Sequence, residues 1–232
     1  MTPIDKNSHL IILSLDALNA QDFDFLTTLP NFKSFIEEGS YVREVESVYP
    51  SVTYTCHSSI ITGVFPDKHG IYANERIHPE RALDQPWNWY EKYIQVPTLF
   101  DYVNEAGLVT ANVLWPVMAD APIRYNCPEI WSVVGESYVS LYLKHASKRA
   151  LPIIFKNASK SKGKEQPYLD NFVESIVLDL IAKKKPNLLT AHLIELDHER
   201  HVSGLHEPVT YDILRRLDQR VGRILEAAKK AG

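Results

Sequence analysis

The stretch HLIILSLD at residues 9–16 decides the fold class of this protein. Its first seven residues form a short, continuous apolar run rich in isoleucine and leucine, which is typical of a strand buried on both faces of a parallel sheet. Similar strands are predicted at residues 187–196, NLLTAHLIEL, and at residues 110–114. Helical patterns alternate with these strands along the chain. The sequence therefore predicts an α/β fold, with a mainly parallel sheet flanked by helices.

Proline, glycine and apolar residues at helical spacing mark the predicted helices. In LPNFKSFIEEGSY, residues 29–41, Pro30 opens a helix and Gly39 closes it. Gly107 is expected to cap the end of another helix. The other predicted elements are a strand at 41–48 and helices at 58–63, 98–106, 171–184 and 209–231.

Residues 77–167 interrupt this alternation of strands and helices. The stretch 76–95 is rich in tryptophan and tyrosine, and we expect irregular structure laid over a core there. The lysine-rich stretch KNASKSKGKEQPY, residues 156–168, is expected to be an exposed loop. We therefore predict a single domain over residues 1–232 with a cap or insertion at about 77–167.

Composition and charge exclude several classes of protein. The 232 residues are 45% hydrophobic and 23% charged, which supports a sizeable core and excludes disorder. The net charge of −4 disfavours binding of a nucleic-acid polymer. The two cysteines, Cys56 and Cys127, cannot form a disulfide framework or a thiolate zinc cluster. The apolar run near the N-terminus is too short for a membrane span, so we expect no membrane partner and a reducing, cytoplasmic setting.

The residues just beyond the strand ends are the first candidates for a binding site, because ligands of open α/β sheets bind there. Asp16 directly follows the first strand, and Asp197 follows the strand at 187–196. Asp197 and His201 are four residues apart and share a face if this segment is helical. Carboxylate and imidazole suit a divalent metal, zinc above all. The alternatives are that Asp16 caps the next helix and that the Asp197–His201 spacing arises by chance.

The segment YPSVTYTCHSSIITGVFPDKHGIYAN, residues 49–74, combines a hydroxyl-rich turn, a helix and a histidine-glycine turn that ends in asparagine. A threonine at the start of a helix most often caps it. It can also act as an alkoxide nucleophile where a metal lowers its pKa and the helix amides stabilise negative charge. On chemistry alone, Thr53 and Thr55 are both candidates for that role.

The sequence resembles the type I phosphodiesterase/nucleotide pyrophosphatase family, within the alkaline phosphatase superfamily. The resemblance rests on LDAL at 15–18, on residues 29–41 and 49–74, and on ELDHERHVSG at 195–204. It is clear over 9–75 and 187–230 and weak between them. It implies an alkaline-phosphatase-like fold that binds two divalent metal ions, zinc (Zn²⁺) first, with Mn²⁺ or Mg²⁺ as alternatives. It also implies a small phosphate-ester substrate such as a nucleotide.

The resemblance also assigns roles to individual residues. Asp16 matches the metal ligand after the first strand, and Thr53, rather than Thr55, matches the metal-bound nucleophile. Asn74 matches the asparagine that holds a phosphoryl oxygen. Asp197 and His201 match the metal pair of a D-x-x-x-H-x-x-G motif. The other histidines of these segments match no role and are expected to be structural or to lie on the surface: His57, His69, His192, His198 and His206.

Part of the family's metal site has no match in the sequence. The family draws a second Asp-His pair from an S-D-H-G-like motif and one further histidine from nearer its C-terminus, and S-D-H-G does not occur here. We therefore expect an incomplete metal site and a chain that lacks the family's C-terminal strands. The predicted function is a metal-dependent hydrolase of phosphodiester or pyrophosphate bonds. The alternatives are a phosphonate or phosphomonoester hydrolase, or a non-catalytic phosphate-binding domain; the oligomeric state is not predicted.

Overall fold

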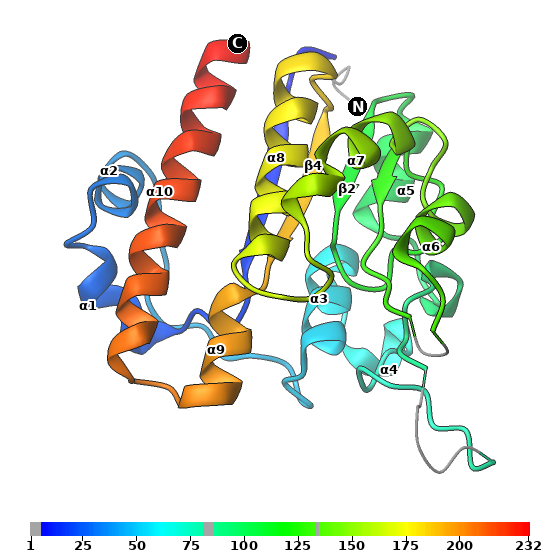
Figure 1. Cartoon of the computed structure of the whole chain (residues 1–232), viewed down its shortest axis with the longest axis horizontal. Helices are drawn as coiled ribbons and strands as arrows, with labels where there is room; N and C mark the ends of the chain where they lie inside the picture. Colours follow the sequence, from blue (N-terminus) through cyan, green and yellow to red (C-terminus); the bar gives the residue numbers. More distant parts are fainter. Residues whose placement is uncertain (1–5, 81–85, 133–134) are drawn as a thin grey trace. The chain divides into compact units, whose positions relative to one another are not determined.

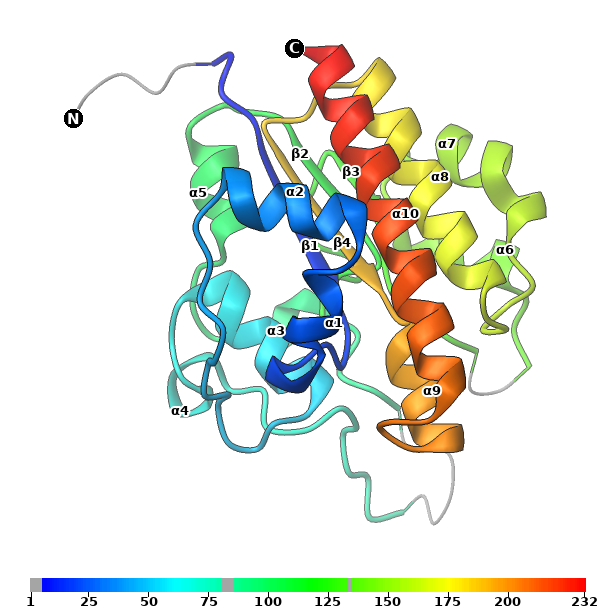
Figure 2. The ribbon, with the colours of Figure 1, turned by 90° about the vertical axis from the view of Figure 1, so that its left-hand side faces the viewer.

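The computed structural model describes residues 6–80, 86–132 and 135–232. Within these ranges four strands form one sheet in the order β1–β4–β2–β3. Figure 1 labels the two neighbouring central strands, β4 and β2, and Figure 2 labels all four. Strand β2 pairs in parallel with both β3 and β4. The strands are β1 (Leu10–Leu15), β2 (Thr110–Val113), β3 (Tyr125–Cys127) and β4 (Leu188–Leu193).

Strands β1 and β4 also run in the same direction. The N–H of Leu10 donates to the carbonyl oxygen of Asn187 at 2.8 Å, and the N–H of Asp16 donates to that of Leu193 at 2.9 Å. Both bonds join residues the same distance apart in the sequence, which is the register of a parallel pair. The predicted α/β fold, an open parallel sheet flanked by helices, is therefore confirmed.

The described residues form two compact units. The first holds residues up to 13, 47–156 and 185–192, and the second holds residues 14–46, 157–184 and 193–232. The predicted single domain with a cap at about 77–167 stays a prediction. That range also supplies β2 and β3 of the sheet.

The core of the first unit packs helices α3 (Thr53–Thr62) and α5 (Leu99–Glu105) with side chains of the sheet and its loops. Ile61, Phe100 and Trp115 are almost fully buried there, and each such side chain contributes roughly 1.5–3 kcal/mol by leaving water. The remaining helices that begin in this unit are α4 (Pro66–His69), η2 (Glu91–Tyr93), α6 (Tyr138–His145) and α7 (Leu151–Asn157).

The second unit is built on helix α10 (Pro208–Ala231), which packs against α2 (Pro30–Glu38), α8 (Tyr168–Lys183) and α9 (Glu195–Ser203). Figure 2 shows α2 and α8 on either side of α10. Of the apolar residues of α10 at helical spacing, four are buried and Leu225 is half-buried; the buried ones are Leu214, Leu217, Val221 and Ile224. The short helices of this unit are η1 (Ala20–Asp22), α1 (Phe23–Leu26) and η3 (Ala158–Lys160).

Most predicted elements are present with small shifts of their ends. Helix α2 begins at Pro30 and ends before Gly39, and Gly107 follows α5 in the left-handed conformation, at φ +70°. The largest shift is in α3, which begins at Thr53 rather than at residue 58. Its first turn is rich in hydroxyl and β-branched residues, which favour helices weakly. The burial of Tyr54 and His57 outweighs that local preference.

Two predicted features are wrong. No strand is assigned over residues 41–48, although the whole of that segment is described. Its side chains Val42 and Val45 are 74% and 78% exposed, so this β-branched segment has no buried face to hold it in a sheet. The predicted loop at 156–168 is helical at its start, because α7 and η3 extend through it to Lys160.

The tryptophan-rich stretch 76–95 is irregular in its described parts, as predicted. Residues 86–95 contain two isolated bridges and the short helix η2, and Trp89 is buried beneath them. Residues 81–85 of the prediction lie outside the described part of the chain.

Helix α2 has no side-chain cap of its own, because its N-cap residue is Leu29. The buried carboxylate of Asp218, on α10, takes its place. One oxygen accepts the backbone N–H groups of Asn31 at 3.0 Å and Phe32 at 2.8 Å, and the other accepts the Asn31 side-chain amide at 2.8 Å. Gly222, one turn later on α10, makes this approach possible, since a Cβ there would lie 2.3 Å from the Asn31 oxygen.

We expect Asp218→Ala to lower the free energy of unfolding by about 2–3 kcal/mol, because it leaves buried helix N–H groups without an acceptor. Asp212→Ala is the matched control on the same helix, since it removes an exposed ion pair with Arg215 and should cost less than about 1 kcal/mol. Urea unfolding measures both values. Equal losses in the two variants would contradict the role given to Asp218.

Candidate active site

Thr53 is the first residue of helix α3, and it does not cap the helix. The N-cap residue is Val52, whose side chain cannot accept a hydrogen bond. Thr53 is half-buried, whereas Thr55 is fully buried and its hydroxyl has no hydrogen-bond partner within the described residues. Of the two threonines considered from the sequence, Thr53 is therefore the one that a ligand at the start of α3 can reach.

Asn74 lies beside the same helix start. Its side-chain oxygen Oδ1 accepts the backbone N–H of Tyr54 at 2.9 Å. Because an N–H can bond only to the oxygen of the amide, this contact fixes the orientation of the side chain and leaves Nδ2 as the donor for a ligand. The backbone of Asn74 is held in turn by Asn88, whose N–H donates to its carbonyl oxygen at 2.7 Å. The structure thus brings the predicted residues Thr53 and Asn74 together.

The first turn of α3 rests on a buried polar chain. The His57 ring donates from Nδ1 to the carbonyl oxygen of Thr53 at 2.7 Å. The Tyr54 hydroxyl donates to Oε1 of Glu129 at 2.8 Å, and Oε2 of Glu129 lies 3.1 Å from Nδ1 of His192. Burial, and then the nearby Glu129, raise the pKa of Tyr54 well above its ordinary value. The hydroxyl is therefore a protonated donor to Glu129.

Asp16 is the residue directly after β1, and it belongs to the second unit. Its Oδ1 accepts the N–H of Ala17 at 3.0 Å, and Ala17 has a left-handed backbone at φ +61°. The first helix after it, η1, is capped by Asn19 in a capping box with Asp22. The alternative that Asp16 caps the next helix is therefore wrong.

Asp197 and His201 share one face of α9, as their spacing predicts. Nε2 of His201 lies 3.5 Å from Oδ1 of Asp197, and the two side chains are 79% and 25% exposed respectively. This oxygen and nitrogen pair has the donor chemistry that zinc uses. Within the described residues, however, no three histidine, cysteine, aspartate or glutamate side chains are grouped closely enough to hold a metal ion. The pair fits a metal as part of a ligand set.

A buried ion pair ties α9 to the turn that carries Asp16. Arg200 lies between Asp197 and His201 in the sequence, and its side chain is only 4% exposed. Its guanidinium group donates to both carboxylate oxygens of Asp22, at 2.5 and 3.0 Å, and also to the carbonyl oxygen of Ala17. Asp16 and α9 are thus held within one hydrogen-bonded network, which a guanidinium fork suits well.

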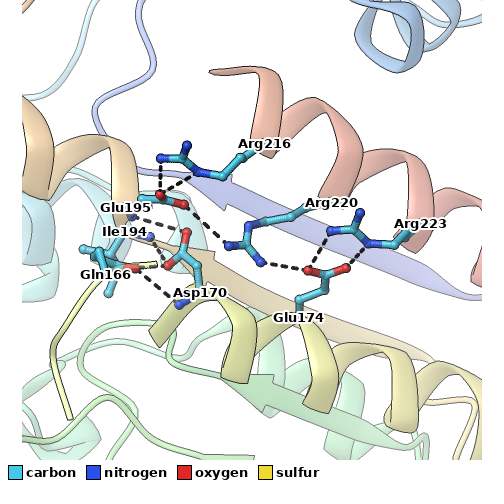
Figure 3. Close-up of polar contacts among 8 residues, drawn as sticks. All are labelled: Gln166, Asp170, Glu174, Ile194, Glu195, Arg216, Arg220 and Arg223. Carbon is cyan, nitrogen blue, oxygen red and sulfur yellow. Dashed lines mark hydrogen bonds and ion pairs between the residues drawn. The ribbon is translucent and has the colours of Figure 1, made fainter. Parts of the chain in front are cut away.

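The start of α9 is anchored by a second network (Figure 3). The carboxyl group of Asp170, on α8, accepts the backbone N–H groups of Ile194 at 2.9 Å and Glu195 at 3.3 Å. Burial raises the pKa of Asp170, against the opposing effect of these N–H groups and of Arg220. The outer part of the network alternates acids and arginines in the order Arg216, Glu195, Arg220, Glu174 and Arg223.

Sequence reasoning did not find Glu129, Asp170 or the Arg200–Asp22 pair. Nothing in the sequence near them separates a buried acid from a surface one, and their partners lie 24 to 178 residues away. The histidines without a predicted role differ in burial. His57, His69 and His192 are buried, whereas His198 and His206 are exposed.

His69, at the end of α4, is held in its neutral form. Its Nδ1 accepts the N–H of Ile71 at 3.1 Å, so Nε2 carries the proton and donates to the hydroxyl of Ser59 at 2.9 Å. Burial lowers the pKa of His69 below its ordinary value of 6.5, and nearby Asp67 opposes this shift in part. The contribution of this ring to stability is therefore present above about pH 6.5 and is lost as the pH falls through the lowered pKa.

We expect the free energy of unfolding to fall between pH 7.5 and pH 5, and we expect His69→Gln to reduce that fall because Gln does not titrate. His198→Gln, at an exposed position on α9, should keep the wild-type pH dependence. Urea unfolding at several pH values measures both slopes. A His69→Gln slope equal to that of the wild type would contradict the lowered pKa.

The comparisons with solved structures identify the fold. The structure superposes on murine ectonucleotide pyrophosphatase/phosphodiesterase 5 with a TM-score of 0.65 and 19% identity, over 97% of this chain and 53% of that one. It superposes equally on phosphonoacetate hydrolase from Sinorhizobium meliloti, at a TM-score of 0.65 and 19% identity, over 97% of this chain and 54% of that one. The fold is thus alkaline-phosphatase-like.

The sequence comparison identifies the family. The family described as type I phosphodiesterase / nucleotide pyrophosphatase matches residues 10–232, and the chain belongs to it. Venom phosphodiesterase 2 of Crotalus adamanteus is 26% identical over 97% of this chain and 25% of its own length. Ectonucleotide pyrophosphatase/phosphodiesterase family member 5 of Homo sapiens is 25% identical over 96% of this chain and 41% of its own length. The chain therefore spans less than half the length of these two relatives.

None of the described helices is long and apolar enough to cross a membrane.

Proposed function

We propose that this chain carries out hydrolysis of phosphodiester or pyrophosphate bonds in small phosphate esters, with Thr53 as the nucleophile. The observation that carries the proposal is the start of α3. There a half-buried threonine is the first helical residue, and the side chain of Asn74 is bonded beside it. Membership of the family supports the reaction class.

The residues of the first unit suit the binding and attack of a phosphoryl group. Backbone N–H groups at the start of a helix, together with the helix dipole, favour an anion there. Nδ2 of Asn74 is positioned to donate to one phosphoryl oxygen. The Thr53 oxygen attacks phosphorus as the bond from phosphorus to the ester or anhydride oxygen breaks, and the hydroxyl proton is taken up by the displaced group. Water then hydrolyses the phospho-threonine, which releases the phosphate product and restores the Thr53 hydroxyl. These donors stabilise the charge that develops on the phosphoryl oxygens.

We also propose a requirement for divalent metal ions, with zinc first and Mn²⁺ or Mg²⁺ as alternatives. In this proposal Asp197 and His201 form one ligand pair, and Asp16, which follows β1, is another ligand. Binding of the nucleophile Thr53 to a metal ion stays a prediction. When bound, such ions supply Lewis-acid stabilisation of negative charge and favour the ionised form of a hydroxyl. The cytoplasmic setting predicted from the sequence is likewise a proposal.

The proposed substrate class is based on the molecules bound in the structures of similar proteins. Murine family member 5 has been solved as an inactive variant in complex with AMP, which supports a nucleotide-type substrate for this chain. The fold match to phosphonoacetate hydrolase in complex with phosphonoacetate supports a phosphonate as the alternative. Fold alone does not separate these substrates.

Thr53→Ala is expected to lower kcat/KM for a nitrophenyl phosphodiester by at least about a thousand-fold, because it removes the attacking oxygen. Thr55→Ala should stay within about three-fold of the wild type, since the Thr55 hydroxyl is buried away from a ligand. Circular dichroism checks that both variants fold. A loss confined to Thr55→Ala would move the nucleophile to that residue.

The substrate class is tested by assaying the wild type on a nitrophenyl phosphodiester, a nitrophenyl phosphomonoester and phosphonoacetate, with added zinc. We expect the diester to be hydrolysed fastest. Preference for the monoester or for phosphonoacetate would select the corresponding alternative. Binding of inorganic phosphate without any hydrolysis would select the non-catalytic domain.

Zinc binding tests the proposed ligands. We expect weak binding by the 232-residue chain, since the assigned residues supply at most two ligands at each of the two metal positions, and catalytic zinc sites usually have three from the protein. Asp197→Asn and His201→Gln should each weaken it by about ten-fold or more. His198→Gln, on another face of the same helix, is the control and should bind as the wild type does. Isothermal titration calorimetry gives the affinities, and equal affinity in all variants would exclude this pair.

A further inference from the structure

We propose that Glu129 and His192 are positioning residues that fix the first turn of α3, and with it the direction of the Thr53 hydroxyl. This inference rests on the proposed function of Thr53. Neither residue lies in a sequence motif that carries the family resemblance, and neither takes part in the reaction outlined above.

Glu129 is a carboxylate with both oxygens committed inside the protein. Glu129 and His192 are 3% and 1% exposed, and Tyr54 is fully buried. One oxygen of Glu129 accepts the Tyr54 hydroxyl, and the other faces Nδ1 of His192. Two bonds at one carboxylate fix its plane, and therefore also the directions of the tyrosine and imidazole rings.

The same network reaches Thr53 by a second route. The ring of His192 lies 4.4 Å from that of His57, centroid to centroid, and His57 donates to the Thr53 carbonyl oxygen at 2.7 Å. The His57 ring also meets Trp115, with centroids 5.0 Å apart, and the Trp115 indole N–H donates to the His57 carbonyl oxygen. His57 is thus in contact with both His192 and Trp115.

As a result, hydrogen bonds hold the backbone on the C-terminal side of Thr53. Its carbonyl oxygen is held by His57, and the N–H of the next residue, Tyr54, is held by Asn74. The side chain of Tyr54 is anchored on Glu129. These contacts fix the peptide group that joins Thr53 to Tyr54, and with it the backbone from which the Thr53 side chain extends. An error of about 1 Å in the position of a nucleophile can cost about a hundred-fold in rate.

Stability alone is a weak reason for such a network. Replacing a buried polar or ionic group together with its partners by apolar side chains of similar volume is often neutral or stabilising. A buried carboxylate that is hydrogen-bonded to a tyrosine and a histidine instead fixes the orientation of both rings. These rings support the first turn of α3, where the proposed nucleophile lies.

The test compares the binding of orthovanadate with that of inorganic phosphate by isothermal titration calorimetry. Vanadate accepts a hydroxyl as a fifth ligand, so its affinity depends on where the Thr53 oxygen points. Phosphate depends on the helix amides and Asn74. The ratio of the two dissociation constants therefore reports the position of the nucleophile without requiring turnover.

We expect Glu129→Gln and Tyr54→Phe to reduce the preference for vanadate by about ten-fold while changing phosphate binding by less than about three-fold. Thr53→Ala should abolish the preference, and adding Glu129→Gln to it should cause no further change. Tyr142→Phe is the matched control, because it removes another buried tyrosine hydroxyl of the same unit, beside Cys127. It should bind both anions as the wild type does.

The outcomes separate the inference from the proposed function. If Thr53→Ala loses the preference but Glu129→Gln and Tyr54→Phe keep it, the positioning role is wrong and the nucleophile stands. Equal weakening of both anions in these two variants would show a general structural role and also overturn the inference. If the wild type shows no preference, or Thr53→Ala retains it, the nucleophile itself is wrong. Tyr54→Phe keeps the ring packing against Trp87, so the test remains decisive if Glu129→Gln does not fold.

Discussion

The first backbone N–H groups of a helix need acceptors, and several of the described helices begin at residues whose side chains cannot supply one. The N-cap residues of α2, α3 and α9 are Leu29, Val52 and Ile194, and none makes a side-chain cap. Each helix start takes its acceptor from elsewhere in the chain: Asp218 for α2, Asn74 for α3 and Asp170 for α9. Because unpaired buried N–H groups are costly, these bonds also fix where each helix starts. The placement of Thr53 and of Asp197 follows from the same requirement.

Much of the fold could be predicted from the sequence because its signals are local. The apolar runs at 9–15 and 187–196 have the length and composition of buried strands, and Pro30 and Gly39 mark the ends of α2. The start of α3 could not be found in this way, since TYTCHSS favours a helix weakly and only the burial of its side chains makes it helical. The strand predicted over residues 41–48 is wrong for the converse reason. The β-branched residues of this segment favour a strand, but nothing among the described residues pairs with it.

The residues of the candidate site also fall into two groups, those that local sequence motifs predict and those that they do not. Thr53, Asn74, Asp197 and His201 were identified because they lie in short motifs, and the structure adds that the first two meet at one helix start while the last two share one face of α9. The residues that hold them could not be identified. Glu129 meets Tyr54 across 75 residues and Arg200 meets Asp22 across 178, and spacing carries no information at such separations.

At α3 and α9, the chemistry of the acceptor matches the charge that the helix is proposed to meet. Asp170 places a carboxyl group at the start of α9, where it opposes the positive end of the helix dipole. The half-buried Asp197 and the exposed His201 on that helix are then suited to a cation. At α3 the acceptor is the neutral amide of Asn74, which satisfies the N–H of Tyr54 without adding negative charge and presents its own donor. A carboxylate at that position would repel a phosphate group, so the amide is what allows α3 to meet an anion.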